Sequence, residues 1–152
     1  MNLTLQTVEE TVIPTSALAV IVVPVYGGHV APLAMERLES IRGLDTPAVL
    51  VVVYGNRAYE KALMELDAFA IPHGLKVIAG ATFIGEHSYS TDKCPIADGR
   101  PNESDLDYAE DFGKKNNGEN SGSCRIRYPL SGGCALPSKR PSQPFFPLFP
   151  PF

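Results

Sequence analysis

The chain of 152 residues contains no tryptophan and only three cysteines. Cys94, Cys124 and Cys134 are odd in number and widely spaced, which fits neither a disulfide framework nor a C-x-x-C metal site. No apolar run reaches the roughly 20 residues that a membrane-spanning helix needs, and the first residues lack the basic cluster of a secretory signal. We therefore expect reduced thiols in a cytoplasmic protein without a membrane segment.

Basic residues are also scarce. The chain has 13 Lys and Arg against 17 Asp and Glu, a net charge of -4, and no basic cluster in its first two-thirds. The long-range field that attracts a phosphate backbone is therefore missing, and we expect no nucleic-acid partner. The hydrophobic fraction of 44% and the charged fraction of 20% are ordinary for a globular protein, and the length fits one domain.

The character of the sequence changes near residue 115. Residues 1–115 carry a net charge of -7, whereas residues 116–152 carry +3 and end in the Pro/Phe-rich stretch from Phe145 to Phe152. Such a density of proline is incompatible with a helix or a central strand. We expect an ordered domain over residues 1–115 and a linker with a Pro/Phe-rich tail over residues 116–152, as a shifted reading frame or a fusion junction would produce.

Three short apolar runs rich in β-branched residues recur in the first domain, at residues 18–23, 49–54 and 76–81. They are continuous rather than alternating, which predicts parallel strands buried on both faces by helices. One more segment, from Leu3 to Val8, alternates apolar and polar residues and predicts a further strand, either beside the strand at residues 18–23 or against a second molecule.

The segments between the apolar runs have helical periodicity. Pro32–Ile41 predicts one helix, stopped by Gly43, and Tyr59–Ala70 predicts a second. A third is expected after Pro101, with Asn102 as its N-cap and Asp105 completing a capping box. The inward side chains of these helices are predicted to be Leu33, Leu38 and Ile41 in the first, Leu63, Leu66 and Ala70 in the second, and Leu106, Ala109 and Phe112 in the third. The order of elements predicts an α/β fold of the doubly wound type.

Loops rich in glycine and aromatic residues follow all three predicted strands, at Pro24–Pro32, Tyr54–Glu60 and Thr82–Ser90. The carboxyl ends of parallel strands meet at one edge of a sheet, where ligands bind in open α/β folds. A planar heteroaromatic ligand suits such loops.

The motifs V-P-V-Y-G-G-x-x-x-P, V-V-Y-G-N-R-x-Y-E and G-A-x-F-I-G-E-H-S-Y-S resemble successive strand-end loops of flavodoxin-like proteins, in the branch often fused to a bacterial-type ferredoxin. The resemblance runs from Leu18 to Lys115. It implies a flavodoxin-like doubly wound parallel sheet and FMN-dependent electron transfer, with Glu86 and His87 as candidates for proton exchange. The flavin-binding residues that it implies are Pro24, Tyr26, Gly27, Gly28, Tyr54, Gly55, Asn56, Arg57 and Tyr59.

Two parts of the family pattern are missing. No Ser/Thr/Gly-rich phosphate loop occurs before Leu18, so we expect the family's N-terminal strand, loop and helix to be missing, and no cysteine pattern of a ferredoxin occurs after Lys115. The resemblance therefore implies FMN that is bound weakly or not at all, a redox partner such as a ferredoxin, and a homo-oligomer formed through an exposed sheet edge. The alternative is a non-catalytic interaction module, or a non-functional fragment, whose glycines merely make turns.

Overall fold

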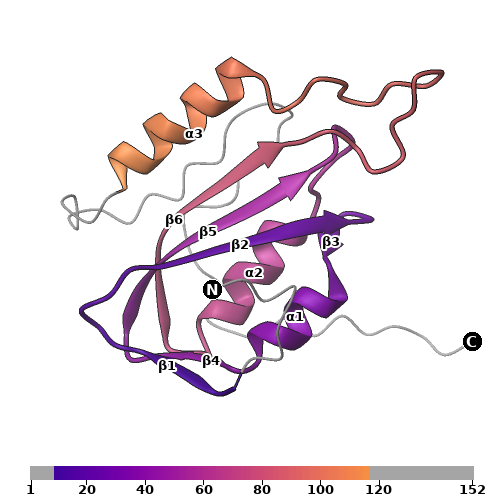
Figure 1. Ribbon diagram of the computed structural model, residues 1–152. Helices are drawn as coiled ribbons and strands as arrows, with labels where there is room; N and C mark the ends of the chain where they lie inside the picture. Colours follow the sequence, from indigo (N-terminus) through magenta and orange to yellow (C-terminus); the bar gives the residue numbers. More distant parts are fainter. Residues whose placement is uncertain (1–8, 117–152) are drawn as a thin grey trace, which may run out of the picture.

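A computed structural model describes residues 9–116, so the strand predicted at Leu3–Val8 and the tail after Asn116 lie outside the described residues. Figure 1 shows the elements in space. In chain order they are β1 (Thr11–Ile13), β2 (Ala19–Tyr26), β3 (His29–Val30), α1 (Pro32–Leu38), β4 (Ile41–Gly43), β5 (Thr46–Tyr54), α2 (Ala62–Ala70), β6 (Leu75–Ile84) and α3 (Glu103–Lys115).

The main sheet has four strands in the order β3-β2-β5-β6. β2, β5 and β6 are parallel, with Ala19 opposite Ala48 and Thr46 opposite Leu75 at the start of the two ladders. The three predicted strands are therefore confirmed as neighbours, each longer than its apolar run. The chain is an α/β protein with a mainly parallel sheet.

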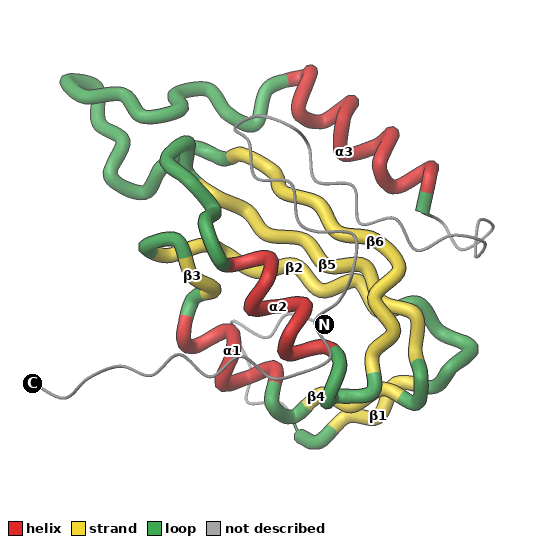
Figure 2. The backbone as a smooth tube through the Cα atoms, turned by 180° about the vertical axis from the view of Figure 1, so that it is seen from behind, coloured by secondary structure: helices red, strands yellow, loops and turns green. Residues whose placement is uncertain are grey.

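Helices lie on both faces of this sheet, as the view from behind in Figure 2 also shows. On one face Leu38 of α1 and Leu66 of α2 pack in a cluster with alternate residues of the strands, such as Leu50. On the other face Phe112 of α3 packs on a smaller cluster that contains Val49 and Val51. Burial of β5 on both faces follows from this arrangement and was predicted from its continuous apolar run.

A second, two-stranded sheet closes the end of the molecule opposite the carboxyl ends of β2, β5 and β6. β1 and β4 pair in parallel there, with Thr11 opposite Ile41. The buried hydroxyl of Thr46 ties this sheet to β5, because it donates to the Ile13 carbonyl at 2.7 Å and accepts from the Leu44 N–H at 3.1 Å. Neither β1 nor β4 is long enough to give a periodic signal in the sequence.

The predicted helices differ from the observed ones at their boundaries. α1 ends at Leu38, and Ile41 belongs to β4 together with Gly43, so the prediction of a helix to Ile41 was wrong. The pairing of β4 with β1 offsets the weak helical preference of β-branched Ile41. α2 begins at Ala62 rather than Tyr59. The third helix is confirmed with its N-cap at Asn102 and its capping box.

Two burial predictions were also wrong. β2 is buried on one face only, because α3 does not cover its outer face, and Val20 and Val22 are 58% and 57% exposed. Leu33 of α1 and Leu106 of α3, both predicted to face inward, are 52% and 58% exposed. α3 has no fully buried residue and contacts the sheet through Tyr108 and Phe112, whose rings both meet that of Phe83 edge to face. Amphipathic spacing predicts the contact stripe of a helix but not how far the sheet extends beneath it.

Candidate functional site

The candidate site is the strand-end edge, defined here as the carboxyl ends of β2, β5 and β6 with the loops that follow them. The first loop is a tight hairpin in which Tyr26 of β2 is opposite His29 of β3. Gly27 and Gly28 connect the strands with φ of 60° and 85°, as a hairpin turn with two left-handed residues requires. Glycine is therefore needed here for backbone conformation.

A carboxylate from α2 holds this hairpin in place. One carboxylate oxygen of Glu65 lies 2.5 Å from the Nδ1 atom of His29, and the other accepts from the Val30 N–H at 3.1 Å. Both groups come from the short strand β3, so α2 and the hairpin are tied together on one side of the sheet. The hairpin turn is thereby kept next to the start of α2.

The second loop, after β5, packs against the first. The N–H of Lys61 donates to the Gly28 carbonyl at 3.0 Å, and a Cβ atom added to Gly28 would lie 2.5 Å from a carboxylate oxygen of Glu60. The space that Gly28 leaves is thus filled by a neighbouring loop. Within the second loop the rings of Tyr54 and Tyr59 meet edge to face, with centroids 5.5 Å apart.

The third loop, after β6, packs against the second. The N–H of Gly85 donates to the Tyr54 carbonyl at 2.9 Å. A Cβ atom on Gly55 would lie 2.7 Å from the Cδ2 atom of His87, so the glycine is required for this close approach. The convergence of the three loops at one edge, predicted from the sequence, is confirmed.

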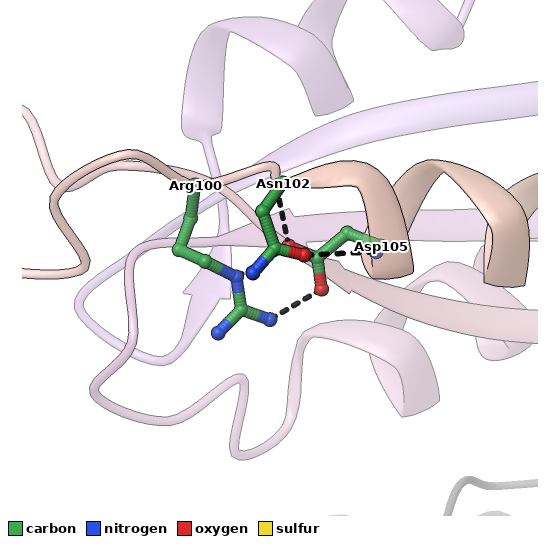
Figure 3. Close-up of polar contacts among 3 residues, drawn as sticks. All are labelled: Arg100, Asn102 and Asp105. Atoms are coloured by element: carbon green, nitrogen blue, oxygen red, sulfur yellow. Dashed lines mark hydrogen bonds and ion pairs between the residues drawn. The ribbon is translucent and has the colours of Figure 1, made fainter.

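A fourth segment, between the third loop and α3, completes the edge. Glu86 donates its N–H to the Arg100 carbonyl at 2.9 Å, and His87 donates its N–H to the Ile96 carbonyl at 3.1 Å. The guanidinium of Arg100 binds both carboxylate oxygens of Asp105, whose carboxylate also accepts from the backbone N–H of Asn102 (Figure 3). Sequence reasoning identified the capping box but missed Arg100, because an ion pair of this kind depends on how the loop returns to the helix.

The ion pair alters both ionisable groups. Hydrogen bonding from Arg100 lowers the pKa of Asp105 below its ordinary value, with the Asn102 N–H contributing and partial burial opposing. The same hydrogen bond raises the pKa of Arg100. The ionised carboxylate of Asp105 therefore stabilises the junction between the fourth segment and α3.

This interaction predicts a pH-dependent loss of stability. Because the pKa of Asp105 is lowered on folding, its contribution is present at neutral pH and is lost as the pH falls through and below about 4. We expect Asp105→Asn to lower the free energy of unfolding at pH 7 and to differ much less from the parent chain at pH 3, as measured by urea denaturation. Glu103→Gln, in the same helical turn but without a described ion pair, is the control. An Asp105→Asn deficit of equal size at both pH values would contradict the assignment.

The predicted flavin-binding residues fall into two groups. Tyr26, which is 63% exposed, is accessible at this edge, as are Pro24, Gly27, Asn56 and Arg57. Gly27 has no atom within 4 Å of an added Cβ position, and Asn56 adopts a positive φ of 59°. Gly28 and Gly55, by contrast, are used for contact between loops, and Tyr54 and Tyr59 are half-buried against each other. Pro24, Tyr26 and Tyr54 belong to strands rather than loops.

His87 and Glu86, the candidates for proton exchange, have different environments. Half-buried His87 accepts from the Tyr89 N–H at 3.1 Å through Nδ1, which leaves Nε2 to carry the proton of the neutral ring. Its ring lies 5.3 Å from that of Tyr89. The carboxylate of Glu86 is exposed. The imidazole is oriented by a backbone contact, as in many structural histidines.

Residues 9–116 contain no group of three or more His, Cys, Asp and Glu side chains placed to hold a metal ion. In the same part of the chain, no helix has the length and apolarity needed to cross a membrane. Comparisons of the chain with protein-family models, with curated proteins and with solved structures gave no match.

Proposed function

We propose that this chain is an FMN-binding electron-transfer domain of the flavodoxin type, which holds the flavin ring at the strand-end edge. The observation that carries the proposal is the meeting of three glycine- and tyrosine-bearing loops after adjacent parallel strands. Ligands in open α/β sheets bind at such edges. A redox protein such as a ferredoxin is the partner that electron transfer requires.

The exposed residues of the edge suit an isoalloxazine ring. Tyr26 offers an exposed aromatic face, and the open surface at Gly27 allows a flat ring to approach the backbone. Bound FMN would supply exchange of one or two electrons, and the protein would supply its binding and orientation. Asn56 and Arg57 are exposed at the same edge and would contact the polar side of the ring.

The phosphate of FMN has no comparable fit at the starts of α2 and α3. The first turn of α3 is closed by its own capping box and carries Glu103 and Asp105, which repel an anion. The start of α2 lies beside Glu60, and its first turn carries Glu65. These helix ends therefore lack the open N–H groups and positive potential of a phosphate site.

From this contrast we expect FMN to bind only in the micromolar range or weaker, and riboflavin to bind nearly as well. Each charge-assisted hydrogen bond that the phosphate fails to make is worth about 1.5–3 kcal/mol, so several missing bonds weaken binding by about three powers of ten. Titration of the purified full chain with both flavins, followed by fluorescence quenching, measures the two dissociation constants. Failure of both flavins to bind folded protein at about 100 µM would overturn the proposed function.

A pair of variants locates the ring. Tyr26→Ala should weaken FMN and riboflavin equally, by about two- to tenfold, because aromatic stacking is worth about 0.5–1.5 kcal/mol and does not involve the phosphate. Leu44→Ala, which removes a 58% exposed apolar side chain beside the β1/β4 sheet at the opposite end of the molecule, is the control and should leave both constants unchanged. Nanomolar FMN with strong preference over riboflavin would instead show that the chain has a phosphate site away from the starts of α2 and α3.

The second candidate is a non-catalytic interaction module. It is favoured by one observation, the exposed apolar face of β2 that α3 leaves uncovered. This reading predicts no flavin absorbance in freshly purified protein and no flavin binding on titration. The two candidates are therefore separated by the same measurement.

A further inference from the structure

One side of β2 is an open sheet edge in the described part of the chain. β5 pairs with one side of the strand from Ala19 to Pro24. On the other side, β3 pairs only with Val25 and Tyr26, at the end of the strand. Between Ala19 and Pro24 no strand within residues 9–116 occupies that side.

The direction of the backbone groups at this edge follows from one hydrogen bond. The Pro24 carbonyl accepts from the Ala31 N–H at 3.1 Å, so the single backbone hydrogen-bonding group of Pro24 faces the side of β3. Backbone N–H and C=O groups alternate in direction along a strand, so those of Val22 and Val20 face the same side as the Pro24 carbonyl. The N–H and C=O groups of Val20 and Val22 therefore point away from β5 at the open edge.

The same residues present an uncovered apolar surface. Leu18, Val20 and Val22 are 38%, 58% and 57% exposed on the face that carries α3. Leu18 and Val20 also line a hollow of about 270 Å³ between this face and α3, together with Phe83 and Phe112. Burial of a valine side chain contributes about 1.5–3 kcal/mol, so this edge gains from a neighbouring strand through both its backbone and its side chains.

The edge also lacks the charges that normally prevent strand association. No Lys, Arg, Asp or Glu occurs from Thr11 to Gly28. Natural edge strands are usually protected by lysine, inward-facing charge or proline, and here Pro24 lies only at the end where β3 already covers the strand. A charged edge would repel an identical copy, whereas this neutral edge is compatible with one.

We propose that two copies of the chain associate through the open edge of β2, antiparallel about a two-fold axis at Val20. The free stretch is Leu18–Val22, because β3 blocks the edge from Pro24 onward. In an antiparallel pair centred on this stretch, Val20 is opposite Val20 of the second copy, and Leu18 is opposite Val22. The three parallel strands of each copy then form one continuous sheet across the axis. The inference is independent of flavin binding.

A charge-swap experiment on the full chain tests this register. Val20→Lys and Val20→Glu each place two like charges opposite each other at the axis and remove two buried valines, so each should raise the dimer dissociation constant by about a hundredfold or more. An equimolar mixture of the two variants places Lys opposite Glu and should form a heterodimer tighter than either homodimer. Light scattering after size-exclusion chromatography, over a range of concentrations, measures the dissociation constants of the two homodimers and of the heterodimer.

Val12→Lys is the matched control, since Val12 is a valine of similar exposure, 54%, on β1. It should leave the dimer of the parent chain unchanged, and circular dichroism should show all variants folded. A parent chain that remains monomeric at about 100 µM would overturn the proposal. A monomer is the result expected if residues outside 9–116 of the same chain cover the edge. A dimer indifferent to Val20→Lys, or a mixture no tighter than the separate variants, would also overturn it.

Discussion

Gly74→Ala is expected to lower the free energy of unfolding by about 3 kcal/mol or more, the largest effect of a methyl group added to any glycine within residues 9–116. Gly74 has a φ of +72°, and an added Cβ atom would lie 2.2 Å from the Gly43 carbonyl oxygen. Neither the backbone at Gly74 nor that at Gly43 can move away easily, because both are held by hydrogen bonds. The Gly43 N–H donates to the His73 carbonyl at 2.7 Å, and the Thr46 N–H donates to the Gly74 carbonyl at 3.2 Å.

The measurement is thermal and urea denaturation of Gly74→Ala beside two glycine controls. Gly99→Ala has a similar φ of +69° but no atom within 4 Å of the added Cβ, so it isolates the backbone cost of about 1–2 kcal/mol. Gly113→Ala, inside α3 with no atom within 4 Å, should stabilise the protein by up to about 1 kcal/mol. Equal destabilisation by Gly74→Ala and Gly99→Ala would contradict the close crossing of the chain at Gly43.

Leu66→Ala is expected to have the second large effect, a loss of about 2–5 kcal/mol. Leu66 of α2 has 0% exposure and belongs to the larger core cluster, together with Leu50 of the central strand β5. Truncation removes buried apolar atoms and leaves a cavity that the parallel strands cannot close without losing their ladder. The loss should appear as a lower urea midpoint with little change in slope.

Met64→Ala on the same helix is the control for this effect. Met64 is 50% exposed, so its truncation should change stability by less than about 1 kcal/mol. A Leu66→Ala variant no less stable than Met64→Ala would show that α2 does not pack on the sheet through Leu66. That result would remove the support of Glu65 for the hairpin as well, because both residues depend on the same placement of α2.

Local chemistry made part of the candidate site predictable. The capping box at Asn102 and Asp105 needs only residues three positions apart, and it was predicted correctly. The meeting of the three loops was also predictable, because parallel strands bring their carboxyl ends to one edge. The hairpin at Gly27-Gly28 had a recognisable Gly-Gly turn signal, but the sequence interpretation assigned it to a ligand-binding loop, and β3 was missed.

Other features depend on distant contacts. Gly28 and Gly55 were predicted to be flavin-binding residues, and the structure adds that the space beside each is filled by a residue of another loop, Glu60 and His87 respectively. Ile41 left the predicted helix to pair with β1, 30 residues earlier, as the register of Thr11 opposite Ile41 shows. Arg100 gained its role only because the loop before α3 returns toward Asp105.

The sequence by itself determined the α/β class, the three parallel strands and the cap of α3, because continuous β-branched runs and capping residues act over a few positions. Only the tertiary structure decided which faces those strands bury. The outer face of β2 is as apolar in sequence as that of β5, yet Val22 is 57% exposed and Val51 is 6% exposed, because α3 lies over β5 and β6. Burial depends on which other elements pack on a residue, whereas an apolar pattern in the sequence indicates only that the residue can be buried.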